Sequence, residues 1–173
     1  MSTDTKVQLH FKIMDSETFA GLDKSHFSSL FSDSNMLARI SDYTTPYMMD
    51  ENTQFFGWFA PEDYDVIELR GKLVALVCFY RLDVEKQMSF PLKSMMPVSQ
   101  CLWMDFFAVH STLRNKGIAK NFILPLIKTQ LPCFAVVKKD NLACLNVLQH
   151  DFITCGEFEN AKKIVYLLLH GKK

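Results

Sequence analysis

The sequence predicts a mixed α/β fold in which a sheet is flanked by helices, and three observations indicate it. Residues 6–14 alternate apolar and polar side chains with a period of two, which is typical of a half-buried strand. Residues 117–130 carry a stripe of apolar side chains at helical spacing, between two predicted strands. Strand and helix patterns follow one another along the whole chain, with no repeat or linker. We therefore expect a single domain over residues 1–173.

About six or seven strands and about four helices are expected, and turn-forming residues mark many of their ends. The first half contains a strand at 6–14, a helix from Ser16, a helix from Ser34 that stops before Pro46, an irregular aromatic segment at 47–61, and strands at 65–70 and 72–82. Ser16 can cap the first turn of its helix, and the residue before a proline disfavours helix. Gly71 separates two apolar segments, which predicts a hairpin.

The second half is expected to contain one long helix between two strands, then a shorter helix and a final pair of strands. The predicted ranges are a strand at 101–109, a helix at 117–130, a strand at 133–137, a helix from Asn141, and strands at 153–158 and 164–169. Pro125 should kink the first of these helices, because proline has no N–H and its ring needs the space of an earlier carbonyl. Residues 83–99 contain prolines and no clear period, so a long loop is expected there.

Composition and charge indicate a globular protein without a strongly charged partner. Apolar residues make up 49% of the 173 residues, which argues against disorder. Lys and Arg together number 19, as do Asp and Glu, so the formal net charge is zero. This balance gives no argument for nucleic acid or an anionic membrane as the main partner. No segment has the length of a membrane span or the form of a signal peptide.

The cysteines and histidines argue against a disulfide framework and against a metal site. The five cysteines are widely spaced, lie mostly in apolar segments and form no Cys-x-x-Cys pair. This pattern predicts reduced core residues of a cytoplasmic protein. The five histidines show no metal-ligand spacing.

The most informative segment is 107–120, where an apolar strand leads through a polar turn into a helix. The first N–H groups of a helix have no partner within it, and the helix dipole adds positive charge, so such a junction can bind an anion. Gly117 allows a phosphate close to the backbone, and Arg114, Lys116 and Lys120 add positive charge. The alternative is a well-capped strand–helix junction that binds no ligand.

This segment resembles the pyrophosphate-binding signature of the GNAT superfamily, the acyl-CoA-dependent N-acetyltransferases, which reads Arg/Gln-x-x-Gly-x-Gly/Ala. The order of predicted elements is also that of the GNAT fold, a central mixed and mostly antiparallel sheet with flanking helices. The resemblance implies that acetyl-CoA is the cosubstrate and that its pantetheine arm lies between the fourth and fifth strands. The residues implied to bind it are Phe107 and Val109 through backbone groups, Arg114, Asn115, Lys116, Gly117, Ile118, Ala119 and Lys120 around the pyrophosphate, and Asn141 at the start of the next helix. For Asn141 a plain N-cap is an alternative that is compatible with this role.

Acetyl transfer to an amine needs a base that takes the proton of the acceptor ammonium. Asp105 is the candidate base, since strand alternation places it on the face of Phe107 and Val109, where apolar neighbours would favour the protonated carboxyl. The alternative is a hydrogen-bonded and inert carboxylate at a strand edge. Glu68, on a neighbouring predicted strand, is the second candidate for the same role.

The acid for the leaving thiolate is where this sequence departs from the family. Many members carry a tyrosine late in the helix before a Gly-Phe pair, whereas this chain has Val147 and Leu148 there. A phenol from elsewhere in the chain could supply the acid, and the candidates are Tyr166, which we take first, Tyr43 and Tyr47. Cys144 occupies a position where relatives have a small or hydroxyl residue, and we expect it to be an inert helical cysteine.

The resemblance implies an N-acetyltransferase that moves an acetyl group from acetyl-CoA to a primary amine by direct attack. The amine would belong to a protein N-terminus, a lysine or a small molecule. By resemblance, residues 33–58 and 154–163 shape the acceptor site, and aromatic side chains such as Phe56 and Trp58 either line it or belong to the core. A first alternative is a non-catalytic acyl-CoA-binding or protein-interaction module on the same fold. A second alternative, acetylation of charged tRNA, is disfavoured by the neutral net charge. A homodimer is left open.

Overall fold

The computed structural model describes residues 8–30, 53–82 and 101–172. The helix predicted from Ser34, the candidate acids Tyr43 and Tyr47, and the loop predicted at 83–99 lie outside these ranges. Among the helices within them, none is long and apolar enough to cross a membrane.

The backbone contacts divide the chain into two compact units. The first unit is Met1–Leu76 with Ala108–Arg114, and the second is Val77–Phe107 with Asn115–Lys173. Strands β3 (Leu73–Leu82) and β4 (Cys101–Val109) each have residues in both units.

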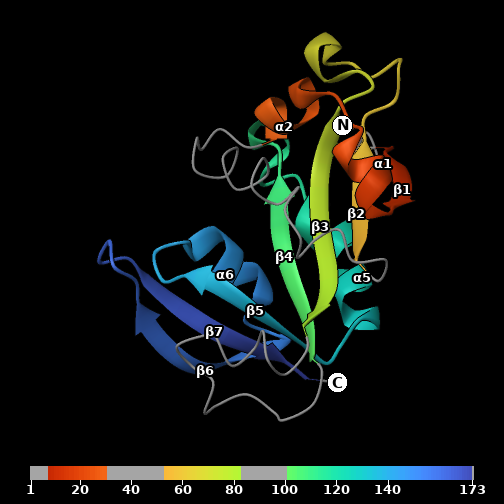
Figure 1. The fold of residues 1–173 in the computed structure, drawn as a ribbon. Helices are drawn as coiled ribbons and strands as arrows, with labels where there is room; N and C mark the ends of the chain where they lie inside the picture. The colour runs from red at the N-terminus through yellow and green to blue at the C-terminus, as the bar shows by residue number, and fades with distance from the viewer. Residues whose placement is uncertain (1–7, 31–52, 83–100, 173) are drawn as a thin grey trace. The chain divides into compact units, whose positions relative to one another are not determined.

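The predicted fold class is confirmed, because the strands form a seven-stranded sheet in the order β1-β2-β3-β4-β5-β7-β6 (Figure 1). β4 and β5 are parallel, whereas the pairs β1–β2, β5–β7 and β6–β7 are antiparallel. A parallel neighbour needs a crossover connection, and the helix that follows β4 supplies it. The described helices of the fold are α1, α2, α5 and α6.

In the first unit, the N-terminal strand and helix exist but with different bounds from those predicted. β1 spans His10–Met14, and the single helix expected from Ser16 is two helices, α1 (Ser16–Ala20) and α2 (Lys24–Leu30). The cap of α1 is Asp15, whose Oδ1 accepts the N–H of Thr18 at 2.7 Å, so Ser16 is not the cap. Since a carboxylate reaches the free N–H groups of a first turn well, Asp is as good a cap as Ser.

The segment predicted to be irregular contains β2 (Gln54–Phe59), and this is a correction. Five of its six residues are buried, so no alternation of apolar and polar side chains marks it as a strand. The strand predicted at 65–70 is also wrong, because this segment holds a 3₁₀ turn, η1 (Ile67–Leu69). Gly71 connects this turn to β3, and the N–H of Ala60 pairs with Lys72 O at 3.0 Å.

In the second unit, the strands β5 (Cys133–Lys138), β7 (Val165–Gly171) and β6 (Phe152–Glu159) lie side by side. Trp103, Phe134 and Leu168 form a cluster at the core of this unit, with exposed fractions of 2%, 6% and 0%. Helix α6 (Leu142–Leu148) buries Cys144 and Leu148. Leu142, at the start of this helix, is 64% exposed.

The helix that follows β4 contains a widened turn immediately before its proline. Residues Ala119–Ile123 are π-helical (η4), and Leu124–Thr129 continue as α5 (Figure 1). The extra residue in a π turn leaves room for the ring of Pro125, which has no N–H to donate. In a regular helix Phe122 would follow the buried Ile118 on the same face, whereas the fully buried residue here is Ile123.

Candidate functional site

Strand β4 is interrupted by a left-handed residue at the position where it leaves β5. Phe106 has a φ of 51° although it lies inside the strand and is 2% exposed. This conformation in a non-glycine residue costs about 1–3 kcal/mol. The register of β4 with β5 consists of the pairs Trp103↔Phe134 and Met104↔Ala135. The two strands therefore separate immediately after Met104, as the resemblance implies for the pantetheine arm.

The turn before the following helix contains two residues with positive φ. Asn115 has a φ of 61° and Gly117 has a φ of 79°. Left-handed residues alternating with ordinary ones turn successive N–H groups toward one side, which creates a concave anion site. The carbonyl of Gly117 accepts the N–H of Asn121 at 2.8 Å and so begins the helix. The binding of an anion by the backbone from Asn115 to Lys120 stays a prediction.

The side chain of Asn121 covers the α carbon of Gly117. A Cβ on Gly117 would lie 2.8 Å from Nδ2 of Asn121, which is too close for an ordinary contact. Glycine is therefore favoured at this position for two reasons: its backbone adopts a positive φ without strain, and it has no Cβ to collide with Asn121. The sequence motif gives no reason for an asparagine four residues later, so sequence reasoning missed Asn121.

Arg114 connects the turn to the end of β4 within the first unit. Its Nε donates to the carbonyl of Val109 at 3.0 Å. The other guanidinium donors of Arg114 can still bind an anion, because arginine has five N–H groups. Lys116 and Lys120 are exposed.

His110 is a residue of this region that the sequence reasoning did not assign. It is 9% exposed, and its Nδ1 lies 3.3 Å from the N–H of Thr112 and 2.9 Å from Oγ1 of Thr112. Burial lowers the pKa of His110, and the charge of Arg114 lowers it further. The neutral ring therefore stabilises the 3₁₀ turn η3 (Ser111–Leu113) that precedes Arg114.

Asn141 is the N-cap of α6, and its Oδ1 accepts the N–H of Cys144 at 3.2 Å. The plain capping role is therefore present, and contact with the cosubstrate stays a prediction. Burial raises the pKa of Cys144 to about 12. A thiol with this pKa is protonated at neutral pH, which agrees with the expectation of an inert cysteine.

The candidate catalytic residues lie in different environments. Asp105 is half-buried in β4, and its Oδ1 accepts the N–H of Phe106 at 2.8 Å. The left-handed Phe106 interrupts the alternation of β4, so the argument that placed Asp105 on the face of Phe107 and Val109 does not hold. Its role as a base stays a prediction.

The other two candidates are placed as follows. Glu68 is exposed in η1 and is not on a strand, which removes the reason for choosing it. Tyr166 is half-buried in β7 and stacks on Phe158, with ring centroids 5.3 Å apart. The stacked ring fixes the phenol on the sheet, and its role as an acid stays a prediction.

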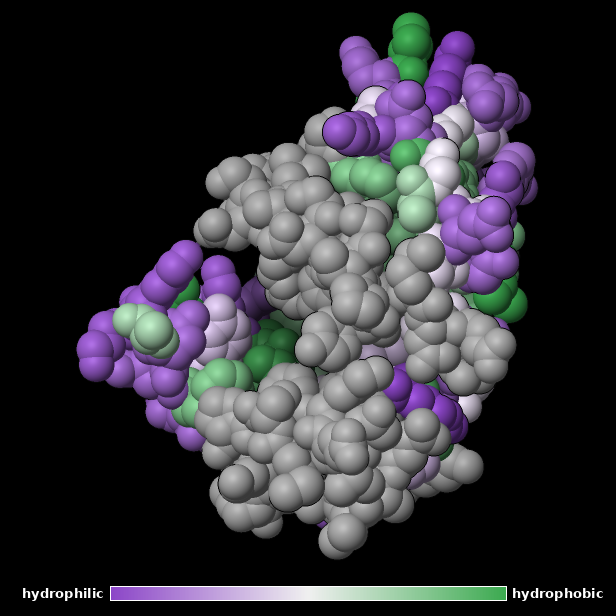
Figure 2. Space-filling model, viewed as in Figure 1, coloured by the Kyte–Doolittle hydropathy of each residue, from purple (hydrophilic) through white to green (hydrophobic). Residues whose placement is uncertain are grey.

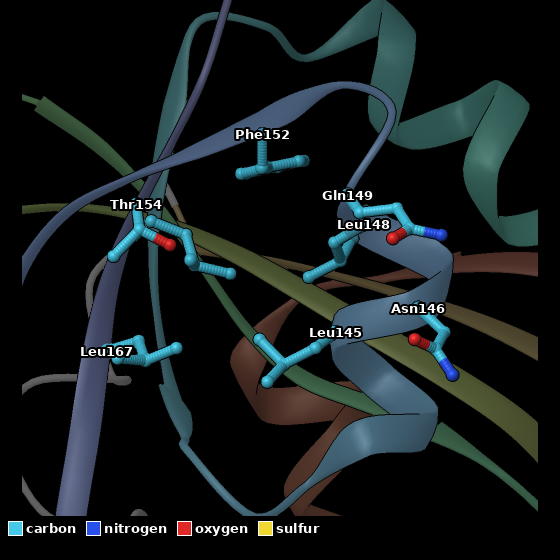
Figure 3. A pocket seen from close by; sticks show the side chains of 8 residues that line it. Leu145, Asn146, Leu148, Gln149, Phe152, Thr154 and Leu167 are labelled. Atoms are coloured by element: carbon cyan, nitrogen blue, oxygen red, sulfur yellow. The ribbon is translucent and has the colours of Figure 1, made fainter.

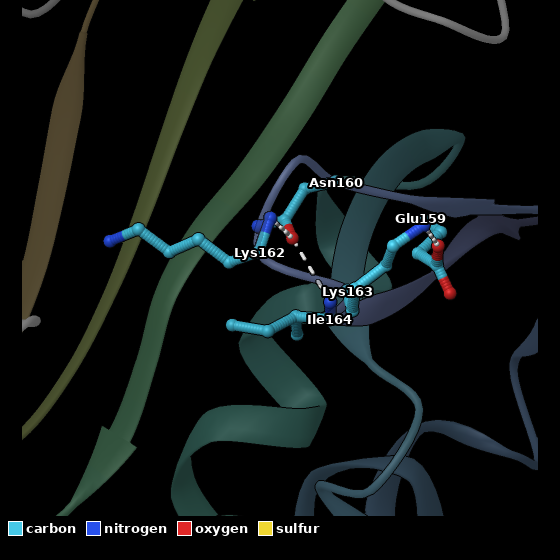
Figure 4. A network of polar contacts seen from close by, with 5 residues as sticks. All are labelled: Glu159, Asn160, Lys162, Lys163 and Ile164. Carbon is cyan, nitrogen blue, oxygen red and sulfur yellow. Dashed lines mark hydrogen bonds and ion pairs between the residues drawn. The ribbon is translucent and has the colours of Figure 1, made fainter.

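The segments predicted to shape the acceptor site are described only in part. Phe56 and Trp58 are 3% and 4% exposed, so both belong to the core of the first unit. The turn between β6 and β7 is organised by Asn160, whose Oδ1 accepts the N–H groups of Lys162 and Ile164, each at 3.0 Å (Figure 4). The exposed side chains at the tip of this hairpin are largely hydrophilic (Figure 2).

A pocket lies between α6 and the strands β6 and β7 (Figure 3). Leu145 and Leu148 of α6 face Phe152, Thr154 and Leu167 of the two strands. None of the predicted catalytic or cosubstrate-binding residues lines this pocket, and Thr154 is its one lining residue from the segments predicted to shape the acceptor site. Five of its eight lining residues are apolar, and we attribute the pocket to packing of α6 on the sheet.

The comparisons with known proteins agree with this geometry. The model of the acetyltransferase (GNAT) family matches residues 32–152, which is more than two thirds of the chain. The chain therefore belongs to the acetyltransferase (GNAT) family. A comparison with curated proteins gives no match.

Several solved structures share the fold at low sequence identity. NAA60 of Arabidopsis thaliana in complex with acetyl-CoA has a TM-score of 0.61 and 11% identity, over 94% of this chain and 97% of that one. An acyl-CoA N-acyltransferase from Pseudomonas aeruginosa has a TM-score of 0.57 and 11% identity, over 95% of this chain and 99% of that one. ElaA of Escherichia coli has a TM-score of 0.55 and 11% identity, over 95% of this chain and 100% of that one. At this identity the likeness concerns the fold.

Membership of the family defines the class of protein. The chain is an acyltransferase, and acetyl-CoA is its cosubstrate. The predicted resemblance, fold class and cosubstrate are thereby confirmed.

Proposed function

We propose that this protein transfers the acetyl group of acetyl-CoA to a primary amine by direct attack. The nitrogen of the amine attacks the carbonyl carbon of the thioester and forms the C–N bond. The C–S bond then breaks, and the thiolate of coenzyme A leaves. The proton of the attacking nitrogen passes to a base or to solvent. The reaction needs no covalent enzyme intermediate, so positioning of the thioester supplies much of the catalysis.

The observation that supports this proposal is the separation of β4 from β5, followed along the chain by the left-handed turn. Backbone groups of β4 that leave the ladder become available to amide groups of a pantetheine arm. We propose that Phe107 and Val109 offer these groups, that Asn115–Lys120 bind the pyrophosphate and that Arg114 and Asn141 assist. The αL residues Asn115 and Gly117 support the pyrophosphate site.

The acceptor amine is proposed by class and not by identity. NAA60 has been solved with a bisubstrate analogue, which shows that a protein of this fold accommodates both substrates together. We keep three candidates for this chain, namely a protein N-terminus, a lysine side chain and a small-molecule amine. A panel of a peptide with a free N-terminus, a lysine peptide with a blocked N-terminus, and polyamines would distinguish them by thioester consumption.

Calorimetric titration with acetyl-CoA tests the cosubstrate site. We expect the wild type to bind and Gly117→Glu to lose affinity at least about 100-fold, because a carboxylate would occupy the anion site. The matched control is Gly117→Ala, which has the same backbone strain without the charge and should lose less affinity than Gly117→Glu. Equal affinity of Gly117→Glu and wild type would contradict the proposed site.

Turnover is tested separately from binding. Release of free coenzyme A in the presence of an acceptor amine would establish the enzyme. If acetyl-CoA binds without thioester consumption across the whole amine panel, the chain is an acyl-CoA-binding module and the proposed reaction is wrong.

We further propose a cytoplasmic location, which the reduced cysteines support. Cys78, Cys133 and Cys144 are buried free thiols among the described residues. Cell fractionation tests the location, and sedimentation tests whether the protein is a homodimer.

A further inference from the structure

We infer that His110 is a positioning residue for acetyl-CoA, because its side chain holds the turn that presents Arg114 to the pyrophosphate. The inference rests on the proposed function, in which Arg114 assists the pyrophosphate site. In this role the imidazole of His110 acts through Arg114 and makes no bond of its own to the cosubstrate.

His110 is anchored by a neighbouring strand at the end of β4. Its backbone N–H donates to the carbonyl of Val74 in β3 at 2.8 Å, and Val74 is fully buried. His110 is itself only 9% exposed. Both residues belong to the first unit. The turn that follows β4 therefore starts from a residue whose backbone and side chain are both held in place.

The side chain of His110 caps the 3₁₀ turn η3. Its Nδ1 accepts the N–H of Thr112 at 3.3 Å and lies 2.9 Å from Oγ1 of the same threonine. A bond that reaches only two residues along the chain forms when the intervening Ser111 adopts the conformation of the turn. The carbonyl of His110 also accepts the N–H of Leu113 at 2.9 Å, and Leu113 is 1% exposed. His110 thus takes part in two hydrogen bonds that hold η3 together.

The turn ends at Arg114, whose side chain reaches back to the strand. The backbone N–H of Arg114 donates to the carbonyl of Ser111 at 3.3 Å, and its Nε donates to the carbonyl of Val109 at 3.0 Å. Val109 immediately precedes His110, so the two ends of the turn are joined by the arginine side chain. The direction of the guanidinium therefore depends on the shape of the turn that His110 caps.

The rest of the guanidinium of Arg114 is available to an anion. Arg114 is exposed, and no carboxylate among the residues that the structure describes forms an ion pair with it. A guanidinium binds phosphate oxygens through N–H groups in a fixed planar arrangement, so its orientation decides how well it binds. A turn that holds this orientation before the cosubstrate arrives reduces the conformational entropy lost on binding.

Three substitutions and one control separate this role from a general loss of stability. His110→Ala removes the acceptor of the Thr112 N–H, whereas His110→Asn supplies an amide oxygen that can accept the same N–H. Arg114→Met removes the guanidinium and leaves the histidine in place. The matched control is Asp15→Ala, because Asp15 caps α1 of the same unit by accepting the N–H of Thr18 at 2.7 Å.

Calorimetry measures the affinity of each variant for acetyl-CoA, and circular dichroism checks that each is folded. We expect His110→Ala to weaken binding by about fivefold and His110→Asn to stay within about twofold of the wild type. Asp15→Ala should lower the unfolding temperature and leave the affinity unchanged. When Arg114→Met is already present, adding His110→Ala should cost no further affinity, because the histidine then has no guanidinium to position.

A truncated thioester gives a readout that a merely structural role would not change selectively. S-acetylpantetheine carries the thioester arm of acetyl-CoA and lacks the pyrophosphate. We expect His110→Ala to leave the affinity for S-acetylpantetheine at the wild-type value while the affinity for acetyl-CoA falls. Ligand-detected nuclear magnetic resonance measures the affinity for the truncated compound, because this method suits weak ligands.

Four results would overturn the inference while the wild type still binds acetyl-CoA. They are wild-type affinity in His110→Ala, a loss in His110→Asn as large as that in His110→Ala, additive losses when His110→Ala and Arg114→Met are combined, and an equal loss of affinity for acetyl-CoA and S-acetylpantetheine. If His110→Ala does not fold, His110→Phe takes its place, because it keeps a ring and has no acceptor nitrogen. Absence of acetyl-CoA binding by the wild type would overturn the proposed function together with the inference.

Discussion

Gly71 and Gly117 occupy two turns with the same backbone requirement and different surroundings. Their φ values are 65° and 79°, and a Cβ at either position would meet the end of a side chain, Glu62 at 2.6 Å or Asn121 at 2.8 Å. At Gly71 the N–H donates to Ala60 O at 3.0 Å, so this turn closes on neighbouring backbone. The carbonyl of Gly117 instead accepts the N–H of Asn121, and a helix begins there. The first N–H groups of a helix lack intrahelical acceptors. The N–H of Gly71 is thus satisfied within its turn, whereas the turn at Gly117 is the one that we propose for the pyrophosphate.

Replacing each glycine by alanine should give the largest effects and separate the two turns. Both Gly71→Ala and Gly117→Ala should lower the free energy of unfolding by about 1–2 kcal/mol, because an L-residue is strained at positive φ. Acetyl-CoA at about 100 times its Kd should stabilise the wild type and Gly71→Ala by about 2.7 kcal/mol. Acetyl-CoA at the same concentration should stabilise Gly117→Ala by less than this amount. Thermal unfolding with and without acetyl-CoA measures both quantities, and equal gains in the two variants would contradict the assignment of the second turn.

Replacing the lysines beside the two turns should give the next largest effect. Lys116→Gln and Lys120→Gln should each weaken acetyl-CoA binding by roughly threefold at low salt, because an exposed cation near a phosphate contributes roughly 0.6 kcal/mol. The loss should shrink as salt is raised. Lys72 follows Gly71 and donates to Oγ of Ser25 at 2.7 Å, so Lys72→Gln is the matched control. Calorimetry at two salt concentrations measures the effect, and a loss in Lys72→Gln of the same size would argue against local binding.

A histidine near each turn makes stability depend on pH in the same direction. Nδ1 of His26 accepts the N–H of Leu73 at 3.0 Å, and burial, followed by the charge of Lys72, lowers the pKa of His26 from 6.5. The pKa of His110 is lowered from 6.5 by burial and then by Arg114. The folded state then binds fewer protons than the unfolded chain. Stability should therefore be fully present above pH 6.5 and be lost as the pH falls through the folded-state values.

Asparagine variants test this pH dependence, because Oδ1 of asparagine can accept the same N–H without titrating. We expect His26→Asn and His110→Asn each to reduce the loss of stability between neutral and mildly acidic pH. Urea unfolding at a series of pH values measures it. A slope that stays at the wild-type value in the double variant would show that other groups cause the acid sensitivity.

The smallest expected effect is the steric coupling between each glycine and its covering side chain. Asn121→Ala should make Gly117→Ala less destabilising by about 0.5 kcal/mol, and Glu62→Ala should do the same for Gly71→Ala. Double-mutant cycles from urea unfolding measure both couplings. Couplings of zero at both positions would mean that the side chains move aside without cost.

The sequence was sufficient where the chemistry is local. The segment from Arg114 to Ala119 carries the family resemblance in six contiguous residues, and the family is confirmed. β4 was predicted with the bounds Cys101–Val109 that the structure has, because a continuous apolar run between two polar segments favours a buried strand. Asn141 was predicted as a cap, since capping involves residues only a few positions apart.

The sequence was insufficient where a residue's state depends on distant neighbours. β2 was missed because its residues are buried on both faces, which removes the alternation that identifies a strand. The strand predicted at 65–70 was wrong because Gly71 closes a turn with Ala60, which precedes it by eleven positions. The π turn before Pro125 shifts the buried stripe by one residue, and no spacing rule anticipates this shift.

The sequence by itself determined the family, the cosubstrate and the turn that we propose for its pyrophosphate, because these depend on a short contiguous motif. Only the tertiary structure decided that Phe106 is left-handed and that Asp105 accepts its N–H. A residue that sequence patterns favour for a strand adopts this conformation only when its buried surroundings outweigh its local preference. The burial of Phe106, which is 2% exposed, depends on side chains from elsewhere in the chain, which the order of residues in β4 does not contain.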